Sequence, residues 1–492
     1  MALALQTRMF IGGAFTAGAA GEVEPVINPA TEAVIGLAPV GTLKDAEAAL
    51  AAAHHSFAHG PWRRMHPRER VERMHAFYAA LERRKPEIVA LLIAEVGATV
   101  ALANGPQWAN GMKHFRFYLE QAGQDFTKLS RPELTPSANG QKILGTSIVR
   151  RDPVGVVAAI TPYNYPFMLN LVKLVPALLM GNSVVLKPSP FTPFSALLFG
   201  DAALEAGLPE GVLNVITGGK EVGEALTTDP RVKLVTFTGS DVVGAAIMAQ
   251  AAPTLKRLLL ELGGKSAMVI RADADLDKAA VAGLNGFTSH TGQGCALMTR
   301  HLVHNAVRKT YVEKLKALAA QVTVGDPADP KTRMGPLIRD AARTRTERYV
   351  QLGVDSGATL VHGGRRPAHL DKGFFFEPTF FDDVDNSSRL AQEEIFGPIG
   401  AVIGFDTDEE AIVIANDSQF ALACSIFSAD AGRAYEIVQQ IATGRAAING
   451  GAGAQLSDEP FGGNGRSGFG RENGVEGLLE FTNANAISFH AA

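Results

Sequence analysis

The sequence predicts an α/β protein built on a doubly wound parallel sheet. From Val154 onward, short apolar runs of strand length alternate with longer segments whose apolar residues recur at helical spacing. This alternation favours parallel strands with helices on both faces of the sheet. The chain has 492 residues, more than a single hydrophobic core usually spans, so we expect two or three domains.

The N-terminal third is predicted to be mainly helical. Apolar residues recur at helical spacing over 44–60 and over 67–95. Before them, "VINPATEAVIGLAPV" predicts short strands joined by an Asn-Pro turn. Residues 125–153 are polar and strand-like, with a turn at Asn139-Gly140, which predicts a hairpin.

The first α/β segment contains the predicted strands "VGVVAAITP", "NSVVLKPSP", "VLNVITG" and "KLVTFTGS". Ligands of such sheets bind beyond the carboxyl ends of the strands, here at 161–166, 187–190, 217–219 and 238–240. A second α/β segment begins near residue 267. A glycine-rich run at 448–470 contains enough Phe and Arg residues to favour an ordered loop over a linker.

Composition excludes several classes of protein. The net charge of −4 argues against a surface built for nucleic acid. Two cysteines cannot form a disulfide framework, and no Cys/His cluster has the spacing of a metal site. The sequence contains no signal-peptide core and no membrane span. We therefore expect a cytoplasmic protein with no metal and no nucleic-acid or membrane partner.

Cys295 lies in "TGQGCALMTR", where the neighbouring glycines give little apolar cover and let a ligand approach the backbone. This setting suits a reactive thiolate. The alternative is a small buried hydrophobic residue, which fits Cys424 well. The local sequence leaves both interpretations of Cys295 open.

Two further residues have chemical potential. Glu261 ends an apolar run in "LLLELGGKS", where partial burial would raise the carboxyl pKa and suit a general base. Asn164 follows a predicted buried strand, where its amide is able to donate to an oxyanion. The alternative for Glu261 is a solvated loop acid, and the alternative for Asn164 is an ordinary turn residue.

Together these residues belong to a recognisable set of motifs, "TPYNYPF", "VVLKPS", "TFTGS", "LELGGKS", "GQGC", "EEIFGP" and "PFGGNGRSGFGRE". With them the chain resembles the aldehyde dehydrogenase superfamily, in its hydrolytic, NAD(P)-dependent branch. The motifs occur in the family's order, and the resemblance covers essentially the whole chain.

The resemblance implies the aldehyde dehydrogenase fold. A doubly wound NAD(P)-binding domain would comprise 1–124 and 148–262, and an α/β catalytic domain 263–465. A small β oligomerisation element would comprise 125–147 and 478–492, with its hairpin pairing with the C-terminal "AISFH" strand and a partner subunit. A homodimer or homotetramer is expected.

The resemblance also implies catalytic roles. Cys295 would attack the aldehyde, and Asn164 and the Cys295 N–H would hold the oxyanion. Hydride transfer would then leave a thioester, which water activated by Glu261 would hydrolyse. Lys173 and Glu472 resemble the family's supporting proton-relay pair.

The implied cofactor is NAD, with NADP not excluded. Lys187 would reach the adenosine ribose, Gly239 and Ser240 the pyrophosphate, and Glu394 and Phe396 the nicotinamide end. The other implied cofactor-binding residues are Thr161, Pro162, Tyr163, Ser189, Pro190, Gly219, Gly223, Phe237 and Leu262.

The stretch "KPSPFTP" departs from the family pattern, because Pro190 replaces a common Glu that binds the adenosine ribose. Loss of that carboxylate removes one barrier to a 2′-phosphate. Two smaller departures are Ser289, which replaces a common Asn, and "GGNGRSG", which lacks a Lys after its double glycine.

The implied substrate tunnel has a mainly apolar wall and no arginine on its helix, which favours a hydrophobic aldehyde, aromatic or medium-chain, over a carboxylate-bearing semialdehyde. The alternative is an enzyme of broad specificity. The implied lining comprises the loop 451–457 together with Tyr165, Met168, Leu169, Val172, Gly294 and Ala296.

Two rival functions remain open at this point. A CoA-acylating aldehyde dehydrogenase would not use the Glu at the position of Glu261, so the presence of that residue favours hydrolysis. A non-catalytic NAD-binding or structural protein on the same fold is disfavoured by the presence of Cys295, Glu261 and Asn164 together.

Overall fold

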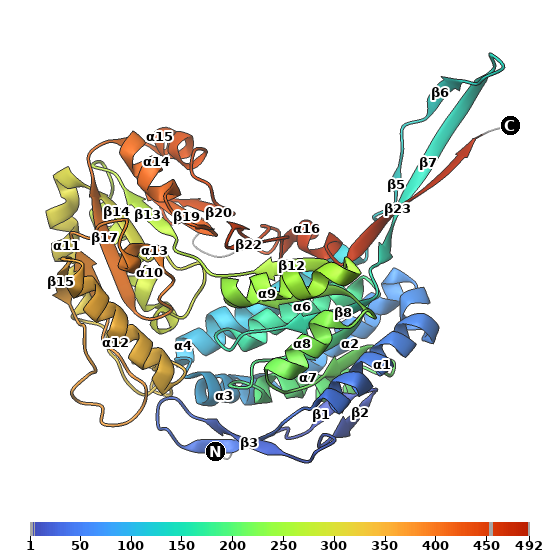
Figure 1. Cartoon of the computed structure of the whole chain (residues 1–492), viewed down its shortest axis with the longest axis horizontal. Helices are drawn as coiled ribbons and strands as arrows, with labels where there is room; N and C mark the ends of the chain where they lie inside the picture. The colour runs from blue at the N-terminus through green and yellow to red at the C-terminus, as the bar shows by residue number, and fades with distance from the viewer. Residues whose placement is uncertain (1–2, 4, 452–455, 491–492) are drawn as a thin grey trace.

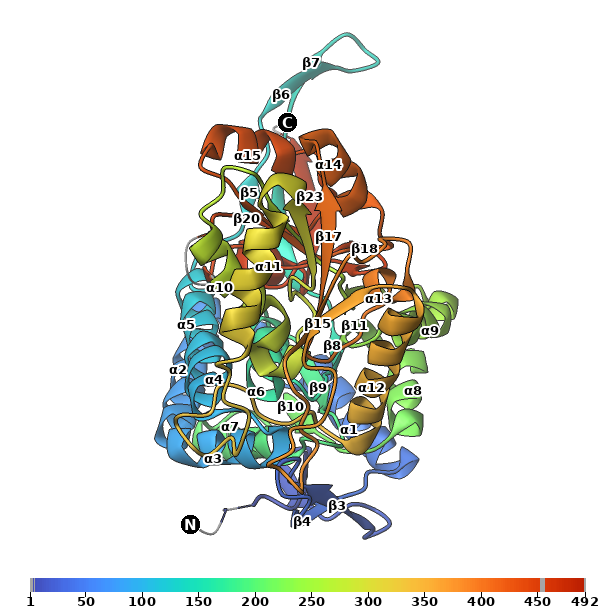
Figure 2. The same cartoon turned by 90° about the vertical axis from the view of Figure 1, so that its left-hand side faces the viewer.

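The computed structural model describes residues 3, 5–451 and 456–490. Two large sheets, each covered by helices, form the body of the molecule, and a long hairpin extends away from it (Figure 1). The N-terminal ribbon of β3 (Val23–Ile27) and β4 (Val34–Pro39) lies at the end opposite to this hairpin (Figure 2).

The first sheet has eight strands in the order β2-β1-β10-β9-β8-β11-β12-β22. Five of them, from β10 to β12, are parallel, as the alternating pattern predicted. In chain order the strands are β1 (Met9–Ile11), β2 (Ala14–Thr16), β8 (Val156–Ile160), β9 (Ser183–Lys187), β10 (Leu213–Val215), β11 (Val232–Thr238), β12 (Arg257–Glu261) and β22 (Gly468–Phe469).

Strand order reverses between β8 and β11, because β9 and β10 continue to one side of β8 while β11 and β12 lie on the other. The carboxyl ends of β8 and β11 therefore flank the crevice in which such sheets bind ligands. Along β8, Val157 and Ala159 pack into one apolar core and Val156 and Ala158 into the core on the opposite face.

Helices cover both faces of this sheet (Figure 1). The helical segment predicted over 67–95 is two helices rather than one, because Arg84 leaves helical geometry and the next helix begins at Lys85, with Pro86 in its first turn. The helices are α1 (Leu43–His59), η1 (Trp62–Arg64), α2 (Pro67–Arg83), α3 (Lys85–Val96), α4 (Val100–Leu102), η2 (Ala103–Ala109), α5 (Asn110–Ala122), α6 (Pro166–Leu179), α7 (Phe194–Glu205), α8 (Lys220–Thr228), α9 (Asp241–Ala251) and η3 (Ala252–Thr254).

The second sheet has the order β15-β16-β17-β14-β13-β19-β20 and is parallel except at β15. Its strands are β13 (Ala267–Ile270), β14 (Arg300–His304), β15 (Thr359–His362), β16 (Thr379–Asp382), β17 (Ile399–Phe405), β19 (Ala423–Phe427) and β20 (Arg445–Ile448). The surrounding helices are α10 (Leu276–Thr288), η4 (Ser289–Gly292), α11 (Asn305–Ala319), α12 (Asp340–Asp355), α13 (Arg389–Gln392), α14 (Asp408–Asn416) and α15 (Ala431–Val438).

The predicted hairpin projects from the body (Figure 1) and consists of β6 (Glu133–Pro136) and β7 (Lys142–Pro153), with β5 (Lys128–Leu129) beside β7. The C-terminal strand β23 (Thr482–His490) pairs antiparallel with β7 along its whole length, as predicted. The glycine-rich run is ordered in its described part, where β21 (Asn464–Gly465) pairs with β18 (Phe420–Ala421) and α16 (Gly474–Leu479) follows.

Within the described ranges, none of the helices is long and apolar enough to cross a bilayer, and no group of His, Cys, Asp or Glu side chains has the arrangement of a metal site.

Candidate active site

Cys295 lies in a loop between η4 and β14 that is held in an unusual backbone conformation. His290, Thr291 and Gly292 all have left-handed backbones, with φ of 48°, 58° and 76°. A Cβ on Gly292 would come 2.0 Å from the carbonyl oxygen of Gly397, so only glycine fits there. The Thr291 hydroxyl donates to the Gly335 carbonyl at 2.8 Å. This packing fixes the backbone that leads to the cysteine.

The Cys295 thiol is surrounded by acidic groups. The residue is half-buried, and burial raises the pKa of its thiol, with the nearby carboxyls of Glu261, Glu394 and Glu472 raising it further. The carbonyl of Cys295 packs closely on Gly264, where a Cβ would come within 2.3 Å of it. At neutral pH the free protein therefore holds Cys295 as a thiol rather than a thiolate.

Asn164 contacts the same loop from the other side. It follows β8 at the predicted ligand edge and is buried. Its Nδ2 donates to the carbonyl oxygen of Gln293 at 2.8 Å, two residues before Cys295. An amide nitrogen carries two hydrogens, so one N–H of Asn164 remains for another acceptor.

Glu261, at the end of β12, is buried and its two carboxylate oxygens have no hydrogen-bond partner among the described residues. Burial raises its pKa well above the usual range, and the charge of Glu472 raises it further, while Lys173 and Arg471 oppose the shift. An unpaired carboxyl with a raised pKa is the type of group that accepts protons near neutral pH.

Lys173 and Glu472 form a buried ion pair beside Glu261. Nζ of Lys173 lies 2.5 Å from Oε1 of Glu472 and donates to the hydroxyl of Thr236 at 3.0 Å. The Lys173 side chain is fully buried. The pair brings α6 and the segment after β22 together, and its charges act on Glu261.

A cavity of about 320 Å³ lies at the carboxyl edge of the first sheet and contains five of the residues predicted to bind the cofactor, Lys187, Pro190, Gly219, Gly223 and Phe237. Lys187 is buried there, and its Nζ makes one long hydrogen bond, 3.4 Å, to the Pro188 carbonyl. Burial lowers its pKa to about 8. A buried ammonium with so weak a partner fits a ligand rich in hydroxyl acceptors.

The apolar walls of this cavity were not predicted from sequence. They include Ile160 and residues of α9, namely Val243, Ala246 and Ile247. The signal in the sequence that could have predicted these walls was the helix that follows "TFTGS". Ser240 caps that helix through its hydroxyl, which accepts from the Val243 N–H at 3.3 Å. An apolar slot of this size, with Lys187 at its edge, fits an adenosine group.

Tyr163, Glu394 and Phe396 lie at the other predicted end of the cofactor. The ring centroids of Tyr163 and Phe396 are 6.1 Å apart and edge-on. Oε1 of Glu394 accepts from the Gly264 N–H at 3.0 Å, and burial raises its pKa to about 7. A Cβ on Gly263 would come 2.6 Å from the Glu394 carboxylate. The Glu394 carboxyl therefore lies close to Gly264, whose backbone packs on the carbonyl of Cys295.

The predicted substrate wall is described in part. Tyr165, which directly precedes α6, and Met168, on its first turn, are half-buried, whereas Leu169 and Val172 are buried. The Tyr165 ring packs edge-on against His290, with centroids 5.2 Å apart. Gly294 and Ala296 are half-buried beside Cys295. Of the predicted opposite wall at 451–457, residues 452–455 lie outside the described residues.

The remaining predicted cofactor residues lie on the same edge. Thr161 and Pro162 directly follow β8, Ser189 follows β9, and Gly239 follows β11. Leu262 packs on α9, where a Cβ on Gly244 would come 2.7 Å from its side chain. The structure thus gathers residues from four strand ends around one crevice.

Comparisons with known proteins identify the class that this fold and site define. The family model of the aldehyde dehydrogenase family matches residues 15–487. The chain is 37% identical to aminoaldehyde dehydrogenase 2 of Zea mays, over 98% of this chain and 94% of that protein. The chain therefore belongs to the aldehyde dehydrogenase family.

Solved structures agree with the sequence comparison. Betaine aldehyde dehydrogenase of Staphylococcus aureus, in complex with NAD+, superposes with a TM-score of 0.94 at 34% identity, covering 98% of this chain and 95% of that one. Indole-3-acetaldehyde dehydrogenase of P. syringae, in complex with NAD+ and IAA, also gives 0.94 at 34% identity, covering 99% and 97%. The aldehyde dehydrogenase fold predicted from the motifs is confirmed.

Proposed function

We propose that this protein oxidises an aldehyde to its carboxylic acid with NAD, through a thiohemiacetal and then a thioester on Cys295. The observation that carries the proposal is the convergence of three groups. The Cys295 thiol lies within the electrostatic influence of Glu261, and the Asn164 amide is bonded to the backbone two residues before Cys295.

Formation of the carbon–sulfur bond needs a base, because the free protein holds Cys295 protonated. Glu261 has a raised pKa and no hydrogen-bond partner among the described residues, so it is suited to take the thiol proton. The thiolate then attacks the carbonyl carbon. The remaining N–H of Asn164 and the Cys295 N–H stabilise the oxyanion.

Bound NAD would supply the hydride acceptor. Once hydride has left the thiohemiacetal carbon, Cys295 carries a thioester. Glu261 then removes a proton from water, the hydroxide attacks the thioester, and the acid and the free thiol are released. The proton that Glu261 took from the thiol has to leave before this second step, and the Lys173–Glu472 pair, which acts on the charge of Glu261, offers it a route away. The proton that Glu261 then takes from water returns to the departing sulfur, which regenerates the thiol.

NAD fits the residues present. The apolar slot around Phe237 and Val243 would hold the adenine, and the weakly bonded ammonium of Lys187 would hold the ribose. Glu394 and Phe396 would hold the nicotinamide end. The solved relatives in complex with NAD+ support this choice over NADP.

The predicted helix wall of the substrate site is mainly apolar. Tyr165, which caps α6, and Met168, Leu169 and Val172 on α6 carry no charge. We therefore propose an aldehyde with an apolar body, aromatic or medium-chain. The names of relatives do not decide the question, because relatives of equal similarity act on betaine aldehyde and on indole-3-acetaldehyde. Betaine aldehyde and aminoaldehydes remain the second candidate class, favoured by the names of several relatives.

An assembly of two or four copies is proposed from the hairpin. The four-stranded arm of β23, β7, β5 and β6 projects beyond the body and exposes Leu129, Leu134 and Leu144. A projecting arm with exposed apolar side chains is expected to pack against another subunit. Light scattering of the whole chain and of L134E/L144E tests this, and a monomeric wild-type protein would contradict it.

The test of the activity is NADH formation from benzaldehyde, followed by absorbance with NAD and NADP in parallel. Turnover that requires Cys295 and exceeds that with betaine aldehyde supports the proposal. Turnover dependent on coenzyme A would support the acylating alternative. NAD binding without turnover of any aldehyde would support the non-catalytic alternative.

A further inference from the structure

The backbone carbonyl of Asn164 accepts a hydrogen bond from a side chain that the mechanism above does not use. Nε2 of Gln107 donates to this carbonyl oxygen at 2.9 Å. Gln107 lies 57 residues earlier in the chain and is fully buried. This bond fixes the peptide plane between Asn164 and Tyr165. It therefore also fixes the direction in which the Asn164 side chain leaves the backbone.

The amide of Gln107 has one favourable orientation at this place. If the amide were turned by 180°, its oxygen would face the Asn164 carbonyl oxygen, and two acceptors repel each other. In the observed orientation Oε1 of Gln107 is buried and has no hydrogen-bond partner among the described residues. A buried acceptor without a partner lowers the stability of the folded chain. An apolar side chain of similar volume would avoid that loss, so stability alone does not explain a glutamine at position 107.

Gln107 lies on an unusual turn of helix. Residues Ala103–Ala109 form the π-helix η2, at the end of which the Asn110 N–H donates to the Gly105 carbonyl, five residues earlier. Pro106 lies inside η2 and has no N–H to donate, so the regular α-helical ladder is interrupted there. A π-turn adds a residue to the helix and rotates the side chains that follow it, and such turns are frequent at functional sites.

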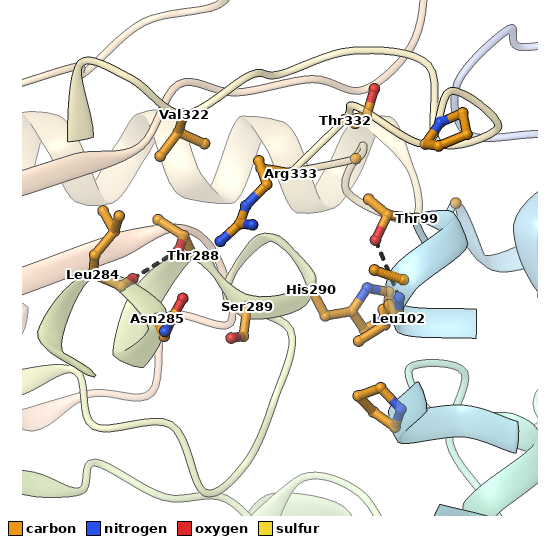
Figure 3. Close-up of a pocket in the computed structure, with 15 residues that line it drawn as sticks. Thr99, Leu102, Leu284, Asn285, Thr288, Ser289, His290, Val322, Thr332 and Arg333 are labelled. Carbon is orange, nitrogen blue, oxygen red and sulfur yellow. Dashed lines mark hydrogen bonds between the residues drawn. The ribbon is translucent and has the colours of Figure 1, made fainter. Parts of the chain in front are cut away.

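The η2 segment is packed firmly against both sides of the site. The Trp108 ring stacks on the Phe167 ring of α6, with centroids 5.1 Å apart and an angle of 15° between the planes. The α4–η2 segment also meets the loop that leads to the cysteine, since Leu102 and His290 line the same cavity (Figure 3). This packing gives Gln107 the rigid support that precise placement of another residue requires.

The Gln107 bond joins a closed set of hydrogen bonds around Asn164. Nδ2 of Asn164 donates to the Gln293 carbonyl at 2.8 Å, and Nε2 of Gln293 donates to the His290 carbonyl at 3.1 Å. The His290 imidazole bonds with the backbone of Asn164, which closes the set. The side chain of Asn164 is thus attached to the loop that leads to Cys295, while its backbone is attached to η2 through Gln107.

We propose that Gln107 is a positioning residue that orients the Asn164 amide toward the oxyanion formed when the Cys295 thiolate attacks the aldehyde. The inference rests on the proposed function and adds to it a residue from a distant segment of the chain. Gln107 acts through Asn164 and supplies no group to the reaction itself. A hydrogen-bond donor stabilises an oxyanion only when it is held in place before the charge develops, which is the role assigned to the Gln107 bond.

The experiment replaces Gln107 by methionine, which has a similar volume and cannot donate a hydrogen bond. Q107M is expected to lower kcat/KM for benzaldehyde about tenfold, less than the loss of about 10²- to 10³-fold for removal of an oxyanion donor itself. The dissociation constant of NAD, measured by calorimetry, is expected to stay unchanged. The midpoint of thermal unfolding is expected to stay the same or rise, because the unpartnered Oε1 is removed.

A second readout separates the oxyanion from hydride transfer. Hydrolysis of 4-nitrophenyl acetate on Cys295 passes through a tetrahedral oxyanion and a thioester and needs no NAD. Q107M is expected to lower this rate by about the same factor as the dehydrogenase rate. In an N164A background, where the amide is absent, Q107M is expected to change either rate less than about twofold. The control Q440M removes an exposed bond from a glutamine to the Glu436 carbonyl and is expected to change neither rate.

The outcomes separate the two proposals. If the wild-type protein oxidises no aldehyde, the proposed function fails, and the ester reaction still tests Gln107; if the ester does not react either, both proposals fail. If Q107M keeps the wild-type rates, Gln107 positions nothing. Equal losses in the wild-type and N164A backgrounds would show that Gln107 does not act through Asn164. A Q107M protein that unfolds at a lower temperature than the wild type would assign Gln107 a structural role instead.

Discussion

Gly462 lies against the carboxylate of Glu261, so closely that a Cβ at position 462 would come 2.7 Å from Oε1 and 2.6 Å from the Gly470 carbonyl. The glycine-rich segment near the C-terminus thus forms one wall of the pocket around the proposed general base. Gly462 is explained by this contact rather than by flexibility, and its neighbour Gly463 by Ser467, whose Cβ would lie 2.3 Å from a Cβ at position 463.

G462A is accordingly expected to displace the Glu261 side chain. Overpacking a tight site costs about 1–3 kcal/mol in the free energy of unfolding. We expect kcat to fall more than tenfold while the dissociation constant of NAD changes little, because the cofactor cavity is lined by other residues. G123A is the control, since a Cβ there would meet only the Glu120 carbonyl oxygen, at 4.0 Å. Full activity in G462A would show that the protein in solution has room for a methyl group between position 462 and the Glu261 carboxylate.

E261Q is expected to slow both steps in which Glu261 acts as a base. Its amide cannot accept a proton from the Cys295 thiol or from water, so the burst of one NADH per active site should be lost or much slowed together with the steady state. Steady-state turnover should fall about 10²- to 10⁴-fold, as for loss of a general base. Rapid-mixing absorbance and mass spectrometry of the quenched protein check this. A burst of one NADH per active site at the wild-type rate, followed by an accumulated thioester, would confine Glu261 to the hydrolysis step.

E472Q is expected to move the acid limb of the pH–rate profile to lower pH. The charge of Glu472 raises the pKa of Glu261, and its removal leaves the opposing effect of Lys173. Glu261 must be deprotonated to act, so a lower pKa preserves activity at lower pH, by about one unit. The profile of kcat from pH 5 to 9 measures the shift. E476Q, on the exposed side of α16, should not move it.

The reactivity of Cys295 with iodoacetamide is expected to be slow at pH 7 in the free protein. Burial and three carboxyls raise its thiol pKa, so the thiolate fraction is smaller than in a free thiol. E261Q removes one of those carboxyls and is expected to accelerate alkylation. A background of C424S isolates the signal from Cys295. Equal rates in the two proteins would show that Glu261 has no electrostatic influence on the thiol.

P190E is expected to increase the preference for NAD over NADP. Pro190 lines the same cavity as Lys187, and a carboxylate there would repel a 2′-phosphate. We expect the ratio of kcat/KM values for the two cofactors to change about tenfold, the effect of roughly 1.4 kcal/mol. P230E places the same charge on an exposed turn as the control. An unchanged ratio would place the adenosine ribose elsewhere.

Much of the fold and of the candidate site of this protein could be predicted from the sequence. The alternation of apolar runs predicted the parallel sheet because buried strands and amphipathic helices have different periods, and the gathering of strand ends at one edge followed from parallel pairing. The motifs around Cys295, Glu261 and Asn164 indicated the family. The break at Arg84 was missed although Pro86 signalled it, since periodicity continues across two helices packed on the same core.

Only the tertiary structure decided the properties that depend on groups far apart in the chain. The pKa of the Cys295 thiol is raised by burial and by the carboxyls of Glu261, Glu394 and Glu472. These groups are far apart in the chain, so no local sequence pattern predicts their combined effect. Gly462 lies against the carboxylate of Glu261, although the two residues are far apart in the chain. Local sequence determines which backbone conformations and side-chain chemistries are available, whereas burial and Coulomb energy depend on distances that only the folded chain defines.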